Sequence, residues 1–149
     1  MSIRMRAPTL LACAALLVLA GCSDDGAEVD PARIALANDA ATEVELLSTQ
    51  LADSWDCARS PAATFDDCPG FSGASTRAID LGTELRLAAE KGEGPAACDT
   101  AMHALSSGLF TWHDSVNAWR NGQAPAPAET SLDPIRDQMA AVITTCIVP

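Results

Sequence analysis

Four stretches of the chain repeat apolar residues at intervals of three and four, the spacing of one face of an α-helix. The stretches cover residues 31–58, 72–91, 95–120 and 134–148. In the first of them the apolar stripe consists of Ile34, Ala37, Ala41, Val44, Leu47, Leu51 and Trp55. Because each stretch is apolar on one face only, the helices are expected to pack together. The pattern predicts an all-α fold built from four helices.

Residues that favour helix ends lie at the boundaries of these stretches. Asp30-Pro31 and Asp133-Pro134 each place an N-cap side chain before a proline at the first helical position. Gly92 follows the second stretch, where a glycine commonly ends a helix. The last stretch ends in VITTCIV, which has strand propensity, but no second strand is visible to pair with it. We therefore interpret it as part of a helix.

The connections between the stretches predict the topology. Residues 92–94 form so short a link that the helices on either side are expected to be antiparallel neighbours. Residues 121–133 form a longer, proline-containing loop that reaches ~43 Å when extended, enough to cross over to the opposite end. The simplest fold is an up-down-up-down four-helix bundle, and a crossover that reverses the last helix is the alternative.

The N-terminus has the features of an export signal. Two arginines precede an apolar run at residues 10–20, which is too short to remain as a membrane-spanning helix. The run ends in the motif Leu19-Ala20-Gly21-Cys22. This motif resembles the lipobox of bacterial lipoproteins, and the resemblance implies export, cleavage before Cys22 and a lipid on that cysteine. An ordinary secretory signal or an uncleaved anchor is the alternative.

The resemblance implies a signal peptide at 1–21 and a lipidated acidic tether at 22–30. The length and helical pattern of residues 31–149 predict a single helical domain. Because two of the basic residues lie in the signal, the mature chain holds seven basic residues against 20 acidic ones, a formal charge of −13. This charge argues against binding to nucleic acids. It also keeps the domain away from anionic lipid headgroups. The membrane is the cell membrane or, in a cell with two membranes, the outer membrane, with the protein facing the periplasm.

Beside Cys22, the mature chain contains four cysteines. An exported protein meets an oxidising compartment, so these cysteines are expected to form two disulfides. In the up-down-up-down bundle Cys57 and Cys68 lie at the end far from the anchor, and Cys98 and Cys146 lie at the other end. The topology predicts the pairs Cys57–Cys68 and Cys98–Cys146. A zinc site is not expected, since the cysteines lack close paired spacing.

All six aromatic residues fall in the half of the predicted bundle that is far from the anchor. They are Trp55, Phe65, Phe71, Phe110, Trp112 and Trp119. Trp112 and Trp119 lie on the apolar stripe of their helix and are expected in the core. Phe65, Phe71 and Phe110 belong either to the core or to an exposed recognition surface, which would form a contiguous apolar patch above ~400 Å².

No motif for catalysis or for a cofactor is visible. A second stripe on the third helix consists of His103, Ser106, Phe110, His113 and Asn117, residues typical of the flank of a helix–helix contact. His103 and His113 lie ~15 Å apart along the helix and cannot bind one metal ion. Asp114 is adjacent to His113 and does not share its face. We therefore expect no metal, no cofactor and no enzyme activity.

The sequence favours a lipid-anchored, extracytoplasmic binding or accessory module at the bacterial envelope, with another protein as its partner. The residues expected to meet that partner, at the end far from the membrane, are Phe65, Asp66, Asp67, Phe71, Phe110 and His113. The alternative is a carrier of a small apolar ligand, with a cavity near Trp112 and Trp119 for which Gly82 and Gly108 leave room. An enzyme is a remote third hypothesis.

Overall fold

A computed structural model gives the structure of the protein and describes residues 30–147. The signal peptide, the lipobox with Cys22 and all but the last residue of the predicted tether lie outside the described residues. The helices are α1 (Pro31–Ala58), α2 (Gly70–Lys91), α3 (Ala96–Arg120) and α4 (Asp133–Cys146), with the short 3-10 helices η1 (Phe65–Asp67) and η2 (Glu129–Leu132) in two connections. The described residues form no strand, so the all-α prediction is confirmed.

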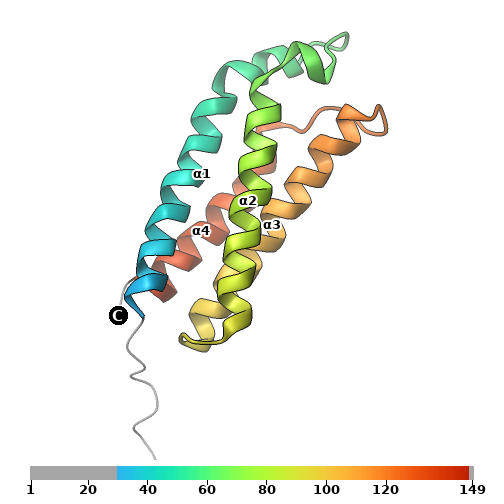
Figure 1. The fold of residues 1–149 in the computed structure, drawn as a ribbon. Helices are drawn as coiled ribbons and strands as arrows, with labels where there is room; N and C mark the ends of the chain where they lie inside the picture. The colour runs from blue at the N-terminus through green and yellow to red at the C-terminus, as the bar shows by residue number, and fades with distance from the viewer. Residues whose placement is uncertain (1–29, 148–149) are drawn as a thin grey trace, which may run out of the picture.

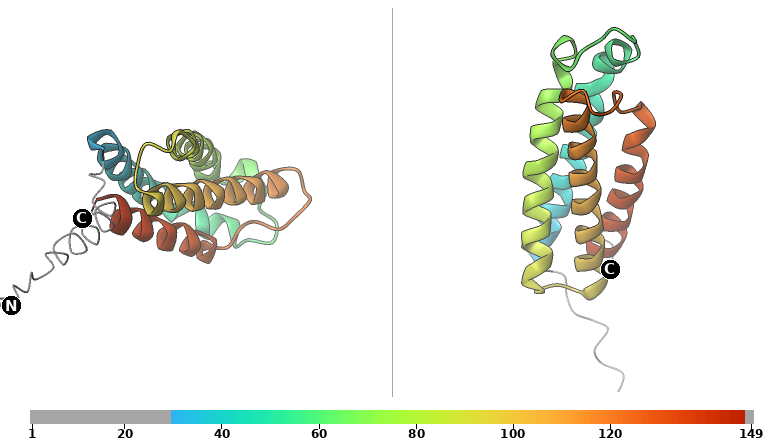
Figure 2. Two further views of the ribbon diagram at one scale, coloured as in Figure 1. Left: turned by 90° about the horizontal axis from the view of Figure 1, so that it is seen from below. Right: turned by 90° about the vertical axis from the view of Figure 1, so that its right-hand side faces the viewer.

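The four helices run alternately up and down side by side (Figures 1 and 2). Each of α1 and α3 packs against both α2 and α4, which gives a bundle with a single core. The loop between α3 and α4 joins them at the same end of the bundle, so α4 is antiparallel to α3. The alternative crossover therefore does not occur. The predicted up-down-up-down topology is confirmed. We refer to the end that holds the start of α1 as the near end and to the opposite end as the distal end.

Of the three helix-end signals at Asp30, Gly92 and Asp133, the first two are confirmed. The Asp30 carboxylate accepts the N–H of Ala32 at 3.1 Å, as expected of an N-cap. Gly92 ends α2 with a φ of 63°, a conformation that other residues adopt at a cost. Asp133, in contrast, is already helical, and its carboxylate accepts from Arg136 at 2.9 Å instead of capping the helix. The expected N-cap at Asp133 is therefore wrong by one position.

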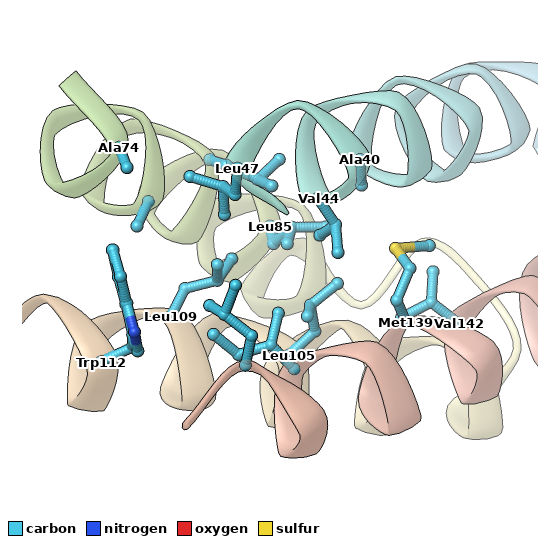
Figure 3. Close-up of a cluster of buried hydrophobic side chains, with 14 of the residues drawn as sticks. Ala40, Val44, Leu47, Ala74, Leu85, Leu105, Leu109, Trp112, Met139 and Val142 are labelled. Atoms are coloured by element: carbon cyan, nitrogen blue, oxygen red, sulfur yellow. The ribbon is translucent and has the colours of Figure 1, made fainter. Parts of the chain in front are cut away.

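The core runs along the length of the bundle and receives side chains from every helix (Figure 3). Leu47 of α1, Leu85 of α2, Leu109 of α3 and Val142 of α4 have no exposed surface. Burying an aliphatic side chain of this size stabilises a fold by about 1.5–3 kcal/mol. The predicted apolar stripes therefore face one another in a shared core.

Two disulfides join the helix ends. They are Cys57–Cys68 at the distal end and Cys98–Cys146 at the near end, which confirms both predicted pairs. Closing loops of these lengths contributes about 3 and about 4 kcal/mol to stability by restricting the unfolded chain. Disulfides persist in oxidising compartments, so they indicate an extracytoplasmic location. In the described range, none of the helices combines the length and apolar character needed to span a bilayer.

Candidate functional site

The loop that joins α1 to α2 covers the distal end of the bundle, and we name residues 59–69 the distal cap (Figure 1). The Cys57–Cys68 disulfide closes it at its base. Within it, the N–H and the hydroxyl of Thr64 both donate to the Asp67 carboxylate at 2.8 Å. The hydrogen bond from the N–H of Thr64, and to a smaller extent the one from its hydroxyl, holds the pKa of the Asp67 carboxyl below its usual value. The cap is therefore an ordered turn with an ionised carboxylate.

Phe65 is half-buried and covers the core at this end. Its ring meets the Trp119 ring edge-on, with 5.7 Å between centroids. The Arg120 guanidinium lies 5.3 Å from the centre of the Phe65 ring, within range of a cation–π contact. Asp66 and Asp67 beside it are exposed.

Phe71 does not belong to any exposed surface, so its assignment to the partner-binding residues is wrong. The side chain has no exposed area. The centre of its ring lies 4.9 Å from the ring centre of Trp55, 5.0 Å from that of Trp119 and 6.4 Å from that of Trp112. The reason is that α2 begins at Gly70, two residues earlier than the sequence pattern predicted. Phe71 thus joins the apolar stripe of α2 and faces inwards.

Phe110 and His113 also lie apart from the distal cap. Both are half-buried and face α2 from the side of α3. The ring of Phe110 fills the space left by Gly82, where a Cβ atom would approach the ring Cε1 to 3.3 Å. The described residues expose three large apolar side chains, Leu46, Leu87 and Ile143, and none lies in the cap. The expected patch of Phe65, Phe71 and Phe110 therefore does not form.

His113 forms polar contacts with a serine that the sequence did not indicate. Its Nδ1 lies 3.1 Å from the carbonyl oxygen of Ser75 and 2.7 Å from the hydroxyl, while its Nε2 lies 2.8 Å from Nδ2 of Asn117. Since a carbonyl only accepts, Nδ1 carries the hydrogen, and His113 is not placed to take a proton from Ser75. Ser75 is also only 6% exposed. The contact holds α2 to α3, as expected for the second stripe.

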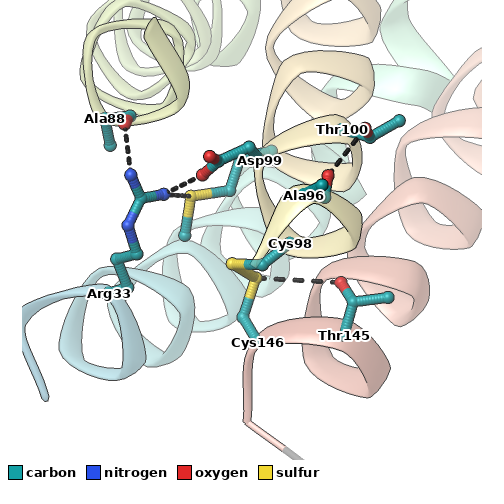
Figure 4. Close-up of polar contacts among 9 residues, drawn as sticks. Arg33, Ala88, Ala96, Cys98, Asp99, Thr100, Thr145 and Cys146 are labelled. Atoms are coloured by element: carbon teal, nitrogen blue, oxygen red, sulfur yellow. Dashed lines mark hydrogen bonds and ion pairs between the residues drawn. A yellow bond between two sulfur atoms is a disulfide. The ribbon is translucent and has the colours of Figure 1, made fainter. Parts of the chain in front are cut away.

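Arg33 is the second polar residue that the sequence-based prediction of the site does not include. It is 4% exposed at the near end, where its guanidinium pairs with the Asp99 carboxylate and donates to the carbonyl oxygen of Ala88 at 2.8 Å (Figure 4). A third contact reaches the sulfur of Met102 at 3.8 Å. Arg33 lies four residues before Ala37, on the apolar stripe of α1, and this position was the signal for its burial.

The cavity near Trp112 is a groove between α3 and α4 that is open to solvent and has a volume of about 390 Å³. Trp112 donates its indole N–H to Ser131 at 3.0 Å on one side of it. Gly108 leaves room for the side chain of Gln138, whose Oε1 is buried and has no hydrogen-bond partner among the described residues. The glycines at 82 and 108 thus allow close packing of neighbouring side chains.

Within residues 30–147, no three side chains of His, Cys, Asp or Glu lie close enough together to hold an ion. Comparison of the chain with models of protein families, with curated proteins and with solved structures found no match. The functional interpretation therefore depends on the geometry of the distal cap and of the helix faces.

Proposed function

We propose that the protein is a lipid-anchored, extracytoplasmic binding module that engages a protein partner through its distal cap. The observation that carries this proposal is that the disulfide-closed cap lies at the end of the bundle opposite Asp30. The 28 residues of α1 separate the two ends by ~42 Å. A lipid attached at Cys22 would therefore place the cap on the side of the domain that faces away from the membrane.

The cap has the properties of a preorganised contact surface. The disulfide and the Thr64–Asp67 contacts fix the loop before any partner arrives, which lowers the entropic cost of binding. Its exposed part combines the partly covered ring of Phe65 with the carboxylates of Asp66 and Asp67. Because the apolar area is small, the charges are expected to orient the partner and to set the association rate. The partner is therefore expected to present basic residues to the carboxylates of the cap.

Crosslinking in intact cells tests the cap directly. A photo-crosslinking residue in place of Asp66 is expected to capture a protein, and Phe65→Ala in the same chain is expected to reduce the yield. The same crosslinker in place of Asp137, an exposed residue of α4, is the matched control. Capture of lipid alone at position 66, or equal yields from both positions, would contradict a partner at the cap.

The lipid anchor has a separate test. The Cys22→Ala chain is expected to lose incorporation of labelled palmitate and to leave the membrane fraction or accumulate as uncleaved precursor. Retention of the label in Cys22→Ala would show that the lipid is attached elsewhere. This result would leave the cap as a binding surface but would remove the reason to place it far from the membrane.

A carrier of a small apolar ligand is the second candidate function. The observation in its favour is the groove beside Trp112. Gln138 lines this groove, and its buried Oε1 accepts no hydrogen bond from the described residues. A ligand in this groove is expected to shift the tryptophan emission, whereas a partner at the distal cap is expected to leave Trp112 unchanged. Titration of Trp55→Phe/Trp119→Phe, which keeps Trp112 as its single tryptophan, with fatty acids and other apolar ligands distinguishes the two functions.

A further inference from the structure

A depression runs between α1 and α2 along the side of the bundle, away from the distal cap. It consists of two adjoining parts of about 520 and about 310 Å³, both open to solvent, which share Glu84 in their walls. One part is bounded by Gln50 and Gly73 towards the distal end, and the other reaches Leu36 and Lys91 towards the near end. We refer to the whole depression as the α1–α2 groove.

Of the three exposed large apolar side chains in the described range, one lines this groove and a second lies beside it. Leu87 is 50% exposed and lines the part at the near end. Leu46 is 41% exposed and lies three residues after Glu43 and four before Gln50, which both line the other part. Residues at these spacings share a helix face, so Leu46 lies beside the groove.

The two leucines are separated along the groove by a distance that a helix can match. Arg33 donates to the carbonyl of Ala88, so Leu87 lies at about the height of the first turn of α1. Leu46 lies about 12 residues further along α1, or ~18 Å. A helix that places apolar residues at positions i and i+11 on one face would contact both leucines.

The charge between the two leucines is negative. Arg77 is paired with Glu43, so its charge is already compensated. Asp80 and Glu84 are exposed, and neither forms an ion pair with another described residue. The part of the groove between the leucines therefore presents two carboxylates without an ion pair, and the near-end part adds Asp30, Glu93 and the cation of Lys91.

This combination selects the occupant. A second copy of the mature chain carries −13 and would be repelled, and so would the tether of this chain, which contains Asp24, Asp25 and Glu28. A polyamine would meet the carboxylates but would leave both leucines exposed. We propose that the α1–α2 groove binds an amphipathic, basic helix of a partner protein, with apolar residues near i and i+11 and Lys or Arg between them.

This surface goes beyond the distal cap and is independent of it. The groove follows the sides of α1 and α2, while the cap covers the end of the bundle, so each can be altered without touching the other. Loss of binding at one surface is therefore informative about that surface alone.

A designed peptide tests the groove. The probe is a labelled 18-residue helix with leucines at i, i+4, i+7 and i+11 and lysines elsewhere on its contact side. It is titrated against the full mature chain in nanodiscs of zwitterionic phosphatidylcholine, with empty nanodiscs as the blank, and followed by fluorescence anisotropy. The expected result is saturable binding that weakens as salt increases. The same peptide with glutamate in place of lysine is expected not to bind.

Substitutions in the groove then locate the contact. Asp80→Lys/Glu84→Lys is expected to raise the dissociation constant about tenfold or more, because like charges are brought together. The milder pair Asp80→Asn/Glu84→Gln is expected to have a smaller effect in the same direction. Asp114→Lys/Asp137→Lys, at exposed positions outside the groove, changes the net charge equally and is expected to have little effect.

The apolar part of the contact has its own matched pair. Leu87→Ala is expected to raise the dissociation constant about fivefold through lost apolar burial, and Ile143→Ala on α4 is the control with a comparable exposed side chain. Phe65→Ala in the distal cap is expected to leave binding of the peptide unchanged. Absence of binding, equal affinity for both peptides, or equal effects of the groove and control substitutions would overturn the proposal and would leave the distal cap untouched.

Discussion

The two ends of the bundle are stabilised by different kinds of interaction. At the distal end, Phe71 is enclosed by three tryptophan rings, and this contact depends on buried apolar area. At the near end, the buried guanidinium of Arg33 depends on the Asp99 carboxylate and a backbone carbonyl. Each end also has one disulfide. The aromatic cluster of the distal end is therefore expected to tolerate changes in charge that would weaken the near end.

The buried ring and the buried ion pair are expected to contribute differently, the ring to the stability of the fold and the ion pair to its specificity. Burial of an aromatic ring lowers the free energy of the folded state directly. A buried ion pair gains little over a pair of apolar residues, because both charges must leave water. Arg33 is bonded to α2 and α3 from its place on α1, so we expect its main effect to be the correct arrangement of these three helices.

The largest expected effect is at the distal end. Phe71→Ala removes a fully buried ring from the contact with Trp55, Trp112 and Trp119, and we expect a loss of about 3–5 kcal/mol in the free energy of unfolding. Denaturant unfolding with both disulfides intact measures it. Phe65→Ala is the control, since its half-buried ring should produce a smaller loss. Equal losses for the two variants would show that the ring of the cap stabilises this end as much as the buried cluster does.

At the near end, Arg33→Ala leaves the Asp99 carboxylate without its partner, and we expect a loss of about 3 kcal/mol. The double variant Arg33→Met/Asp99→Leu replaces both charges by apolar side chains and is expected to recover most of that loss. The same unfolding measurement applies. If the double variant were as unstable as Arg33→Ala, the ion pair itself would stabilise the near end, and its role would not be limited to arranging the helices.

A smaller effect is expected at Gly94, in the link between α2 and α3. A Cβ atom at this position would lie 2.7 Å from Cδ and Nε of Arg33. Because Arg33 is held by its bonds to Asp99 and Ala88, it cannot move aside freely, and we expect Gly94→Ala to cost about 1–2 kcal/mol. Gly92→Ala is not a suitable control, since its φ is positive. Glu93→Ala, at an exposed position of the same link, serves instead and should be close to neutral.

Sequence periodicity was sufficient for the helices, the topology and the disulfides. The apolar stripes determine which face of each helix is buried, and a short link of residues 92–94 makes α2 and α3 antiparallel. Once the topology is known, the positions of the cysteines along their helices determine which pairs meet. These features depend on local patterns or on the order of elements, which a sequence displays directly.

The predicted binding surface failed where it depended on contacts between distant residues. The apolar pattern indicates a start of α2 at residue 72, which leaves Phe71 in the loop, because local sequence determines helix ends poorly. The helix begins at Gly70 instead. Phe110 is accommodated by Gly82 on another helix. Arg33 meets Asp99 from 66 residues away. The sequence around one residue of such a contact does not indicate which distant residue it meets.

The smallest expected effect concerns the pH dependence of the distal cap. Since the pKa of Asp67 is lowered on folding, chiefly by the N–H of Thr64, its carboxylate stabilises the folded cap at pH values above the ordinary value of 3.8. This stabilisation is lost as the pH falls through the lowered pKa. We expect the carboxyl carbon of Asp67 to titrate by NMR below the ordinary value of 3.8. Asp67→Asn should remove this acid dependence while leaving the near end unchanged. A titration of Asp67 at or above 3.8 would mean that the Thr64 contacts do not persist in solution, and the cap would then lack the preorganisation on which its role as a binding surface depends.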